Sequence, residues 1–165
     1  MIEVLVSIVI LSIGLLGIAK LMLVSSHAND SAYLRSQATE LAYEILDNMR
    51  ANRQEAINQP TYITPALPVV TTATPLGFSC YGAAQCTTTN LGLFDVYQWK
   101  LRLNTASNPG GTQIGALPNG QGSVAIVTVN GQTTATIQVF WDDTIAQTTF
   151  GAATNQQSVT LETVL

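Results

Sequence analysis

The sequence predicts an α+β protein: one long N-terminal α-helix packed on a small head with an antiparallel β-sheet. Two observations support this prediction. Helical periodicity runs from the N-terminus with no proline before Pro60, and the last third of the chain alternates apolar and polar residues in short runs. A chain of 165 residues has room for one ordinary domain and one appended element. We therefore divide it into residues 1–25, 26–58 and 59–165.

The first part, residues 1–25, is apolar enough to cross a membrane. No charged residue occurs between Val4 and Ala19, and four more apolar residues follow Lys20. As a helix, about twenty residues span a hydrocarbon core of about 30 Å, and Lys20 can extend its amine to the head-group layer. A cleavable signal would show a basic leader, a shorter apolar centre and a small-residue cleavage site. None of these is visible, so we expect a retained membrane anchor.

Gly14 and Gly17 interrupt this apolar run, and each costs about 1 kcal/mol of helix stability relative to alanine. Two interpretations compete. Small residues let membrane helices pack closely, or the two glycines mark a place where the helix can loosen. The sequence favours neither.

Residues 26–58 continue the helix with one apolar face. Its apolar residues recur at spacings of three or four, and they are Leu34, Ala38, Leu41, Ile45 and Met49. Arg50 and Arg53 follow the acidic residues, an order that complements the helix dipole. We expect the helix to end near Ile57 and its apolar face to cover the sheet of the head.

In the head, residues 59–165, a β-hairpin is predicted by the run GSVAIVTVNGQTTATIQVFWDD. Its strands would lie near Val124–Val129 and Thr134–Trp141, joined by an Asn130-Gly131 turn. On the second strand the core-facing residues would be Ala135, Ile137, Val139 and Trp141. The C-terminal run SVTLETVL predicts a third strand, with Val159 and Leu161 on one face.

The segment DVYQWKLRLN is ambiguous. Asp95 and Gln98 form a capping pair for a helix that would place Val96, Trp99 and Leu103 on one face, yet the near alternation of large residues also suits a strand. Pro, Gly and Thr dominate residues 61–90 and 107–121, where we expect long surface loops.

Cys80 and Cys86 are the only cysteines. Their spacing in a polar loop suits a small disulfide worth roughly 2–3 kcal/mol in the chain-entropy model, which would require an oxidising compartment such as a periplasm. Two inert thiols are the alternative. A metal site has too few ligands here.

Composition and motifs give little sign of other chemistry. The net charge is −4 and no basic cluster occurs, which argues against a nucleic-acid partner. The lone His27 is expected to be a solvated interface histidine. Asp142 and Asp143 lack the glycine-punctuated oxygen ligands of a calcium loop and suit a strand-end turn. We predict no enzyme and no catalytic residue, cofactor or metal site.

The N-terminal run MIEVLVSIVILSIGLLG resembles the N-terminus of type IV pilins. The further runs RSQATELAYEILDNMRANRQEA, QWKLRL, LPNGQGSV and VFWDD, in this order, resemble the PilV family of minor pilins. The resemblance implies the type IV pilin fold and favours a helix for DVYQWKLRLN. It also implies that Glu3, otherwise an interfacial residue, meets a neighbour's N-terminal ammonium during assembly.

The resemblance further implies a location and partners. The protein would be held in the bacterial inner membrane by a single span with its head in the periplasm, and would then enter an extracellular pilus, at its tip. Partners would be the prepilin peptidase, the assembly platform, the major pilin, other minor pilins and a large tip adhesin. The function would be to initiate pilus assembly and so support twitching and adhesion.

One departure from the family is clear. Family members carry a short basic leader and place the glutamate fifth in the mature protein, whereas here it is third. We expect the leader and two residues to be missing from this sequence. Two other functions stay open: a minor pseudopilin of type II secretion, and a signal-anchored periplasmic binding module or enzyme that never assembles.

Overall fold

The chain is described by a computed structural model that places residues 2–58, 60–67, 80–81, 86–103, 115–152 and 154–165. Its helices and strands follow in this order: α1 (Ile2–Ala51), α2 (Arg53–Asn58), the 3-10 turn η1 (Pro60–Tyr62), β1 (Thr64–Leu67), α3 (Thr88–Leu103), β2 (Gln121–Val129), β3 (Gln132–Asp142), α4 (Thr144–Phe150) and β4 (Gln156–Val164). One long helix and an antiparallel sheet make this an α+β protein, as predicted.

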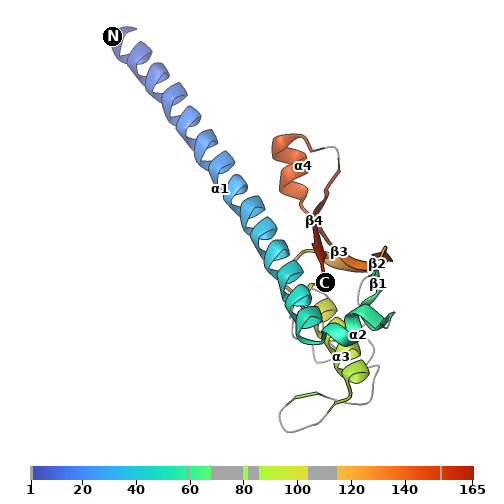
Figure 1. Cartoon of the computed structure of the whole chain (residues 1–165). Coiled ribbons are helices and arrows are strands. Elements are labelled where there is room, and N and C mark those ends of the chain that lie inside the picture. The colour runs from blue at the N-terminus through green and yellow to red at the C-terminus, as the bar shows by residue number, and fades with distance from the viewer. Residues whose placement is uncertain (1, 59, 68–79, 82–85, 104–114, 153) are drawn as a thin grey trace.

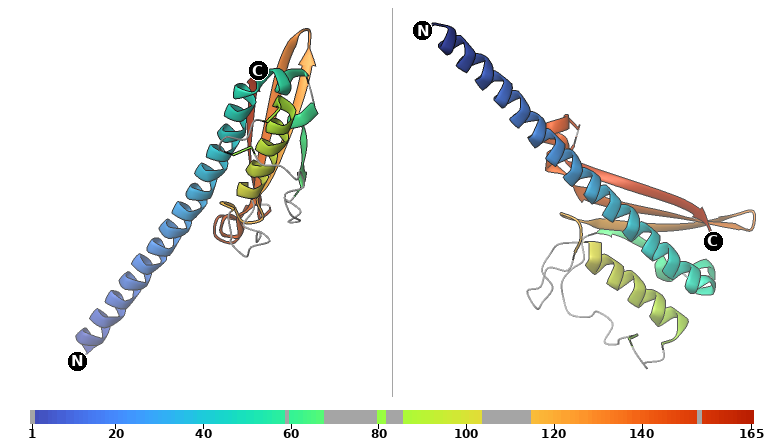
Figure 2. Two further views of the ribbon diagram at one scale, coloured as in Figure 1. Left: turned by 90° about the horizontal axis from the view of Figure 1, so that it is seen from below. Right: turned by 90° about the vertical axis from the view of Figure 1, so that its left-hand side faces the viewer.

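α1 has two different surroundings along its length. Its N-terminal part projects from the molecule as a bare rod, and its C-terminal part lies against the head (Figure 1). In Figure 2 the sheet and α3 both lie alongside this C-terminal part. The head is thus built around the C-terminal part of α1, and no described residue of α1 before Ala38 is buried.

The sheet is antiparallel with strand order β1-β2-β3-β4. The predicted hairpin is confirmed: Val129 pairs with Gln132, and Asn130 and Gly131 make the turn with φ values of 52° and 80°. Both central residues therefore have the positive φ that a type I′ turn requires. The predicted C-terminal strand is also confirmed, as β4, with Ile137 opposite Leu161.

α1 and α3 cover one face of this sheet and make the core with it. The predicted inward residues of β3 and the apolar positions of α1 are buried in one cluster, which includes Ala38, Leu41, Ile45, Met49, Ala135, Ile137, Val139 and Trp141. Trp99 and Leu103 of α3 are buried in the same cluster. At Gly122 of β2 an added Cβ would lie 2.3 Å from the Trp99 ring, so only glycine lets α3 approach this closely.

Three predictions need correction. The helix that was expected to run unbroken to Ile57 is interrupted at Asn52, and α2 continues it to Asn58. Part of the expected loop 61–90 is η1 and β1, and most of its remainder lies outside the described residues. α3 is a helix, as the resemblance favoured, but it begins at Thr88 rather than at Asp95.

Candidate functional site

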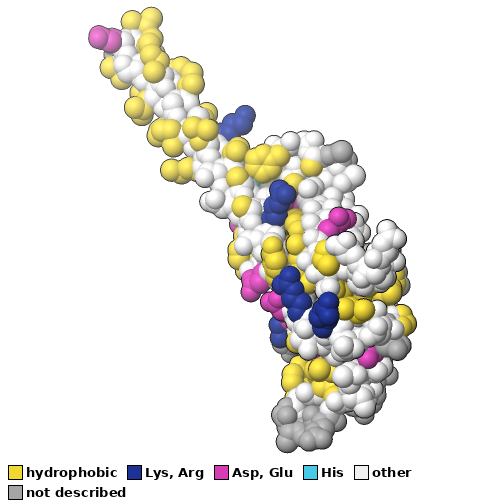
Figure 3. Space-filling model, viewed as in Figure 1, with side chains coloured by type: hydrophobic (Ala, Val, Ile, Leu, Met, Phe, Trp, Pro, Cys, Tyr) yellow, Lys and Arg dark blue, Asp and Glu magenta, His cyan; other side chains and the backbone are white. Residues whose placement is uncertain are grey.

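The exposed part of α1 is the most unusual surface of the described chain. It is the one helix there that is long and apolar enough to cross a membrane, with a mean hydropathy of 2.6 over its most apolar stretch and no residue of that stretch buried. Hydrophobic side chains cover the projecting rod (Figure 3). Burying one large aliphatic side chain contributes about 1.5–3 kcal/mol, so this surface requires lipid or another protein around it.

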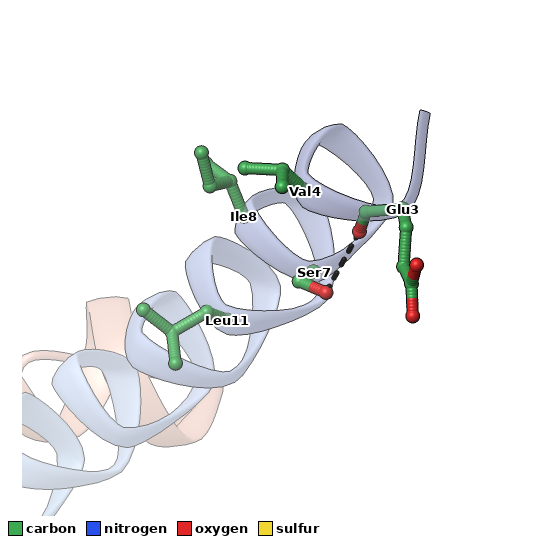
Figure 4. Close-up of a pocket in the computed structure, with 5 residues that line it drawn as sticks. All are labelled: Glu3, Val4, Ser7, Ile8 and Leu11. Carbon is green, nitrogen blue, oxygen red and sulfur yellow. Dashed lines mark hydrogen bonds between the residues drawn. The ribbon is translucent and has the colours of Figure 1, made fainter. Parts of the chain in front are cut away.

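Glu3 lies in the first turn of α1, where the helix dipole favours a negative charge. Its carboxylate extends away from the helix, while Val4 and Ile8 project on the opposite side in Figure 4. A shallow, open depression on the helix surface is lined by Glu3, Val4, Ser7, Ile8 and Leu11. Within the described residues no cation pairs with Glu3.

Two serine hydroxyls of the apolar part bond to the backbone of their own helix. Ser7 Oγ donates to the backbone oxygen of Glu3 at 2.8 Å, and Ser12 Oγ donates to that of Ile8 at 2.7 Å. Hydroxyls bonded in this way add little to the cost of placing the helix in hydrocarbon. α1 continues unbroken through Gly14 and Gly17, and apart from the adjacent residues and the backbone of α1 itself no atom would lie within 4 Å of an added Cβ at either position.

The head is fastened to α1 by buried and charged contacts. Trp99 Nε1 donates to the backbone oxygen of Leu41 at 2.8 Å in the core. Arg102 forms an ion pair with Glu44 at 2.6 Å on the surface. Because the two pairs join α3 to successive turns of α1, a force that moves α1 along its axis also moves the head.

A second attachment lies closer to the apolar part and was not predicted. His27 was expected to be a solvated interface residue, but its Nδ1 lies 3.0 Å from Thr149 Oγ1 of α4. Ser31 Oγ donates to Asp143 Oδ2 at 2.5 Å. Asp143, expected in a strand-end turn, is buried and caps α4 by accepting from the backbone N–H of Ala146 at 2.8 Å. The spacing from Asp143 to Gly151, which ends α4, was the sequence signal for this helix.

A buried polar cluster surrounds the helix break at Asn52. Asn52 Nδ2 donates to the backbone oxygen of Thr88 at 2.7 Å and to Tyr62 Oη at 3.3 Å, and Tyr62 Oη donates to Asp95 Oδ2 at 2.7 Å. Burial raises the pKa of Asp95, partly opposed by the Tyr62 hydroxyl, and burial with the Asp95 contact raises the pKa of Tyr62. Glu55 is also buried and accepts from the Thr61 and Thr88 hydroxyls.

This cluster and the rest of the described chain offer little for catalysis or metal binding. Within the described ranges no three His, Cys, Asp or Glu side chains come together as a metal site. The Tyr62 hydroxyl holds the Asp95 carboxyl in place, and the Thr61 and Thr88 hydroxyls hold the Glu55 carboxyl. We assign the cluster to the structure of the head.

Cys80 and Cys86 form a disulfide in the structure, with a sulfur–sulfur distance of 2.03 Å. Tyr81, which follows the first cysteine, packs its ring edge-on against Phe94 of α3, with 4.9 Å between ring centroids. Tyr81 thereby places Cys80 beside α3, one of the two helices that cover the sheet.

Comparison with known proteins gives one match. A family model described as Tt1218-like, type IV pilin Tt1218, matches residues 21–97. No curated protein and no solved structure matches the chain significantly. The matched residues begin after Lys20 and include the C-terminal part of α1, α2, β1 and the N-terminal part of α3. The match supports a type IV pilin, and it is independent of Glu3 and of the apolar residues before Lys20, which lie outside it.

Proposed function

We propose that this protein is a minor pilin of a type IV pilus, of the kind found in the PilV family. It is stored in the bacterial inner membrane by residues 1–25, with its head in the periplasm, and is then extracted into the filament. There it joins other minor pilins and a large adhesin at the tip and initiates assembly. The observation that carries the proposal is the division of α1 into a bare apolar half and a half buried in the head.

Two environments fit the bare half equally well in physical terms. Lipid covers it before assembly, and the apolar helices of neighbouring subunits cover it afterwards. The exchange needs little net hydrophobic free energy, because acyl chains and aliphatic side chains are similarly apolar. Glu3 distinguishes the two environments. Inside a helix bundle its carboxylate has no water, so a positive group of a neighbouring subunit must lie close to it.

The first test asks whether the protein enters pili. A tagged full-length protein is expressed, filaments are sheared from the cells, and immunoblotting and gold labelling locate the tag. We expect label at filament ends and loss of pili when the gene is deleted. If the protein stays in the membrane fraction while pili form normally, it is a periplasmic module anchored in the membrane or a component of another assembly.

The second test addresses Glu3 directly. Glu3→Gln keeps the size of the side chain and removes its charge, so we expect normal membrane insertion and strongly reduced entry into pili. Ser7→Ala, one turn further along α1, serves as the matched control and should assemble normally. Equal incorporation of both variants into sheared filaments would falsify the assembly role of Glu3.

A further inference from the structure

α4 runs beside α1 in the direction of the apolar part. Asp143, at the start of α4, accepts a hydrogen bond from Ser31 of α1, whereas Thr149, near the end of α4, contacts His27. α4 is therefore antiparallel to α1, and its C-terminal end is the end nearer to the N-terminus of the chain. Figure 1 shows α4 standing above the sheet alongside α1.

The end of α4 lies just past the apolar run. His27 follows Val24, the last residue of that run, by three positions, which corresponds to about 4.5 Å along a helix. The head-group layer on each side of a bilayer is roughly 5–8 Å thick. When the apolar run fills the hydrocarbon core, Thr149 and Phe150 are therefore level with the lipid head groups.

The chemistry of this end suits such a place. Phe150, the last residue of α4, has half of its surface exposed. No Asp, Glu, Lys or Arg occurs from Thr144 to Leu161, so no charge loses its water when this end approaches lipid. The helix is also closed, because Gly151 adopts the left-handed conformation and Ala152 N donates to the backbone oxygen of Ala146 at 3.2 Å.

We propose that the C-terminal end of α4, through Phe150, rests in the head-group layer and is a second lipid contact of the stored subunit. This inference rests on the proposed storage of the protein in a membrane. Apolar and aromatic side chains on surface helices insert at this depth. With α1 as the first contact, a contact beside it restricts how far α1 sinks and how much it tilts before extraction.

The test measures the depth of single tryptophans in vesicles. The full-length protein is reconstituted in phosphatidylethanolamine and phosphatidylglycerol vesicles that contain phosphatidylcholine brominated on the acyl chains near the glycerol. The variants are Phe150→Trp, Val24→Trp as a marker of the span, and Val127→Trp, a similarly exposed position on the hairpin, as the matched control. Quenching by bromine is compared after subtraction of the wild-type signal from the buried Trp99 and Trp141.

We expect Phe150→Trp to lose fluorescence nearly as strongly as Val24→Trp, and Val127→Trp to lose none. Gln147→Trp, on α4 but one turn further from the span, should be quenched less than Phe150→Trp. If Phe150→Trp is unstable, Gln147→Trp is used in its place. Quenching of Val24→Trp alone would overturn the lipid contact and leave membrane storage intact, with a neighbouring subunit as the alternative occupant. Absence of quenching in all variants would overturn both.

Discussion

Among single residues, Asp95 shows most clearly how packing changes chemistry. The Tyr62 hydroxyl donates to its carboxyl, and no lysine or arginine forms an ion pair with it in the described part of the chain. Loss of water is the main cause of its raised pKa, and the hydrogen bond from Tyr62 opposes it only in part. The folded head therefore holds a proton on Asp95 at a pH where the unfolded chain has released it.

This shift makes the stability of the head depend on pH. Because the pKa of Asp95 is raised from 3.8 in the folded state, the folded state binds more protons than the unfolded state above that pH. The stabilisation that Asp95 contributes is therefore largest at low pH, where the carboxyl is protonated in both states. It is lost as the pH rises through the raised pKa. Asp95→Asn should flatten this decline in urea titrations in detergent, whereas Asp47→Asn, an exposed carboxyl, should not. Parallel pH profiles for wild type and Asp95→Asn would contradict the assignment.

The disulfide gives a second prediction for single residues. Cys80→Ser removes the link to Cys86, and the closed loop that is lost is short, so we expect the free energy of unfolding to fall by about 2 kcal/mol. The double variant Cys80→Ser with Cys86→Ser should fall by a similar amount, because the link is lost only once. Thermal unfolding under oxidising conditions measures both, and unchanged midpoints would show that the disulfide adds no stability.

Among the elements, those with strong periodicity could be predicted from the sequence. α1 and the hairpin of β2 and β3 have long apolar patterns. The core-facing residues predicted for α1 and β3 lie in the core or, for Leu34, against it, whereas the buried Ala42 and Leu46 were not named. β1 was missed because it has four residues and includes Pro65, which removes a hydrogen-bond donor and suits only an edge strand. α4 was missed because seven mostly polar residues show no helical period, although its cap at Asp143 was visible.

The contacts of α4 could not be predicted for a different reason. Asp143 and Ser31 are 112 positions apart, and nothing in the sequence relates a serine on a helix to an aspartate after a strand. The start of α3 could have been predicted. Thr87 accepts from the backbone N–H of Asn90 at 3.2 Å, as an N-cap residue does, but the capping pair at Asp95 fits the capping pattern better and was chosen instead. Side-chain contacts between elements that are distant in the sequence depend on the folded topology, which a local sequence pattern does not reveal.

α4 provides the prediction for this scale. Asp143→Ala removes both the cap of α4 and the partner of Ser31, so we expect a local loss of about 1–2 kcal/mol. Hydrogen exchange of the α4 amides should accelerate while the amides paired between β2 and β3 keep their protection. Gln147→Ala, an exposed change on the same helix, is the control. Acceleration throughout the sheet would mean that α4 is part of the core's cooperative unit.

For the whole molecule, the decisive feature is that one helix belongs to two environments. Every buried residue of α1 lies between Ala38 and Met49, and Leu34 is the first that packs on the core. We therefore expect the head to fold without the apolar part, whose most apolar stretch has no buried residue. Under the proposed function, this separation would let the same head exist on a stalk surrounded by lipid or by other helices.

Truncation tests this separation. A chain that begins at Ser26 keeps His27, Ser31 and all core residues of α1, so we expect a soluble, folded monomer whose thermal midpoint is close to that of the full chain in detergent. A chain that begins at Ala42 loses Ala38 and Leu41, and with Leu41 the acceptor of Trp99 Nε1, so its midpoint should fall by many degrees. Near-ultraviolet circular dichroism of the buried Trp99 and Trp141 follows both transitions. If the chain from Ser26 is unfolded, the head needs the apolar part of α1 to fold. The two parts of α1 are then not independent.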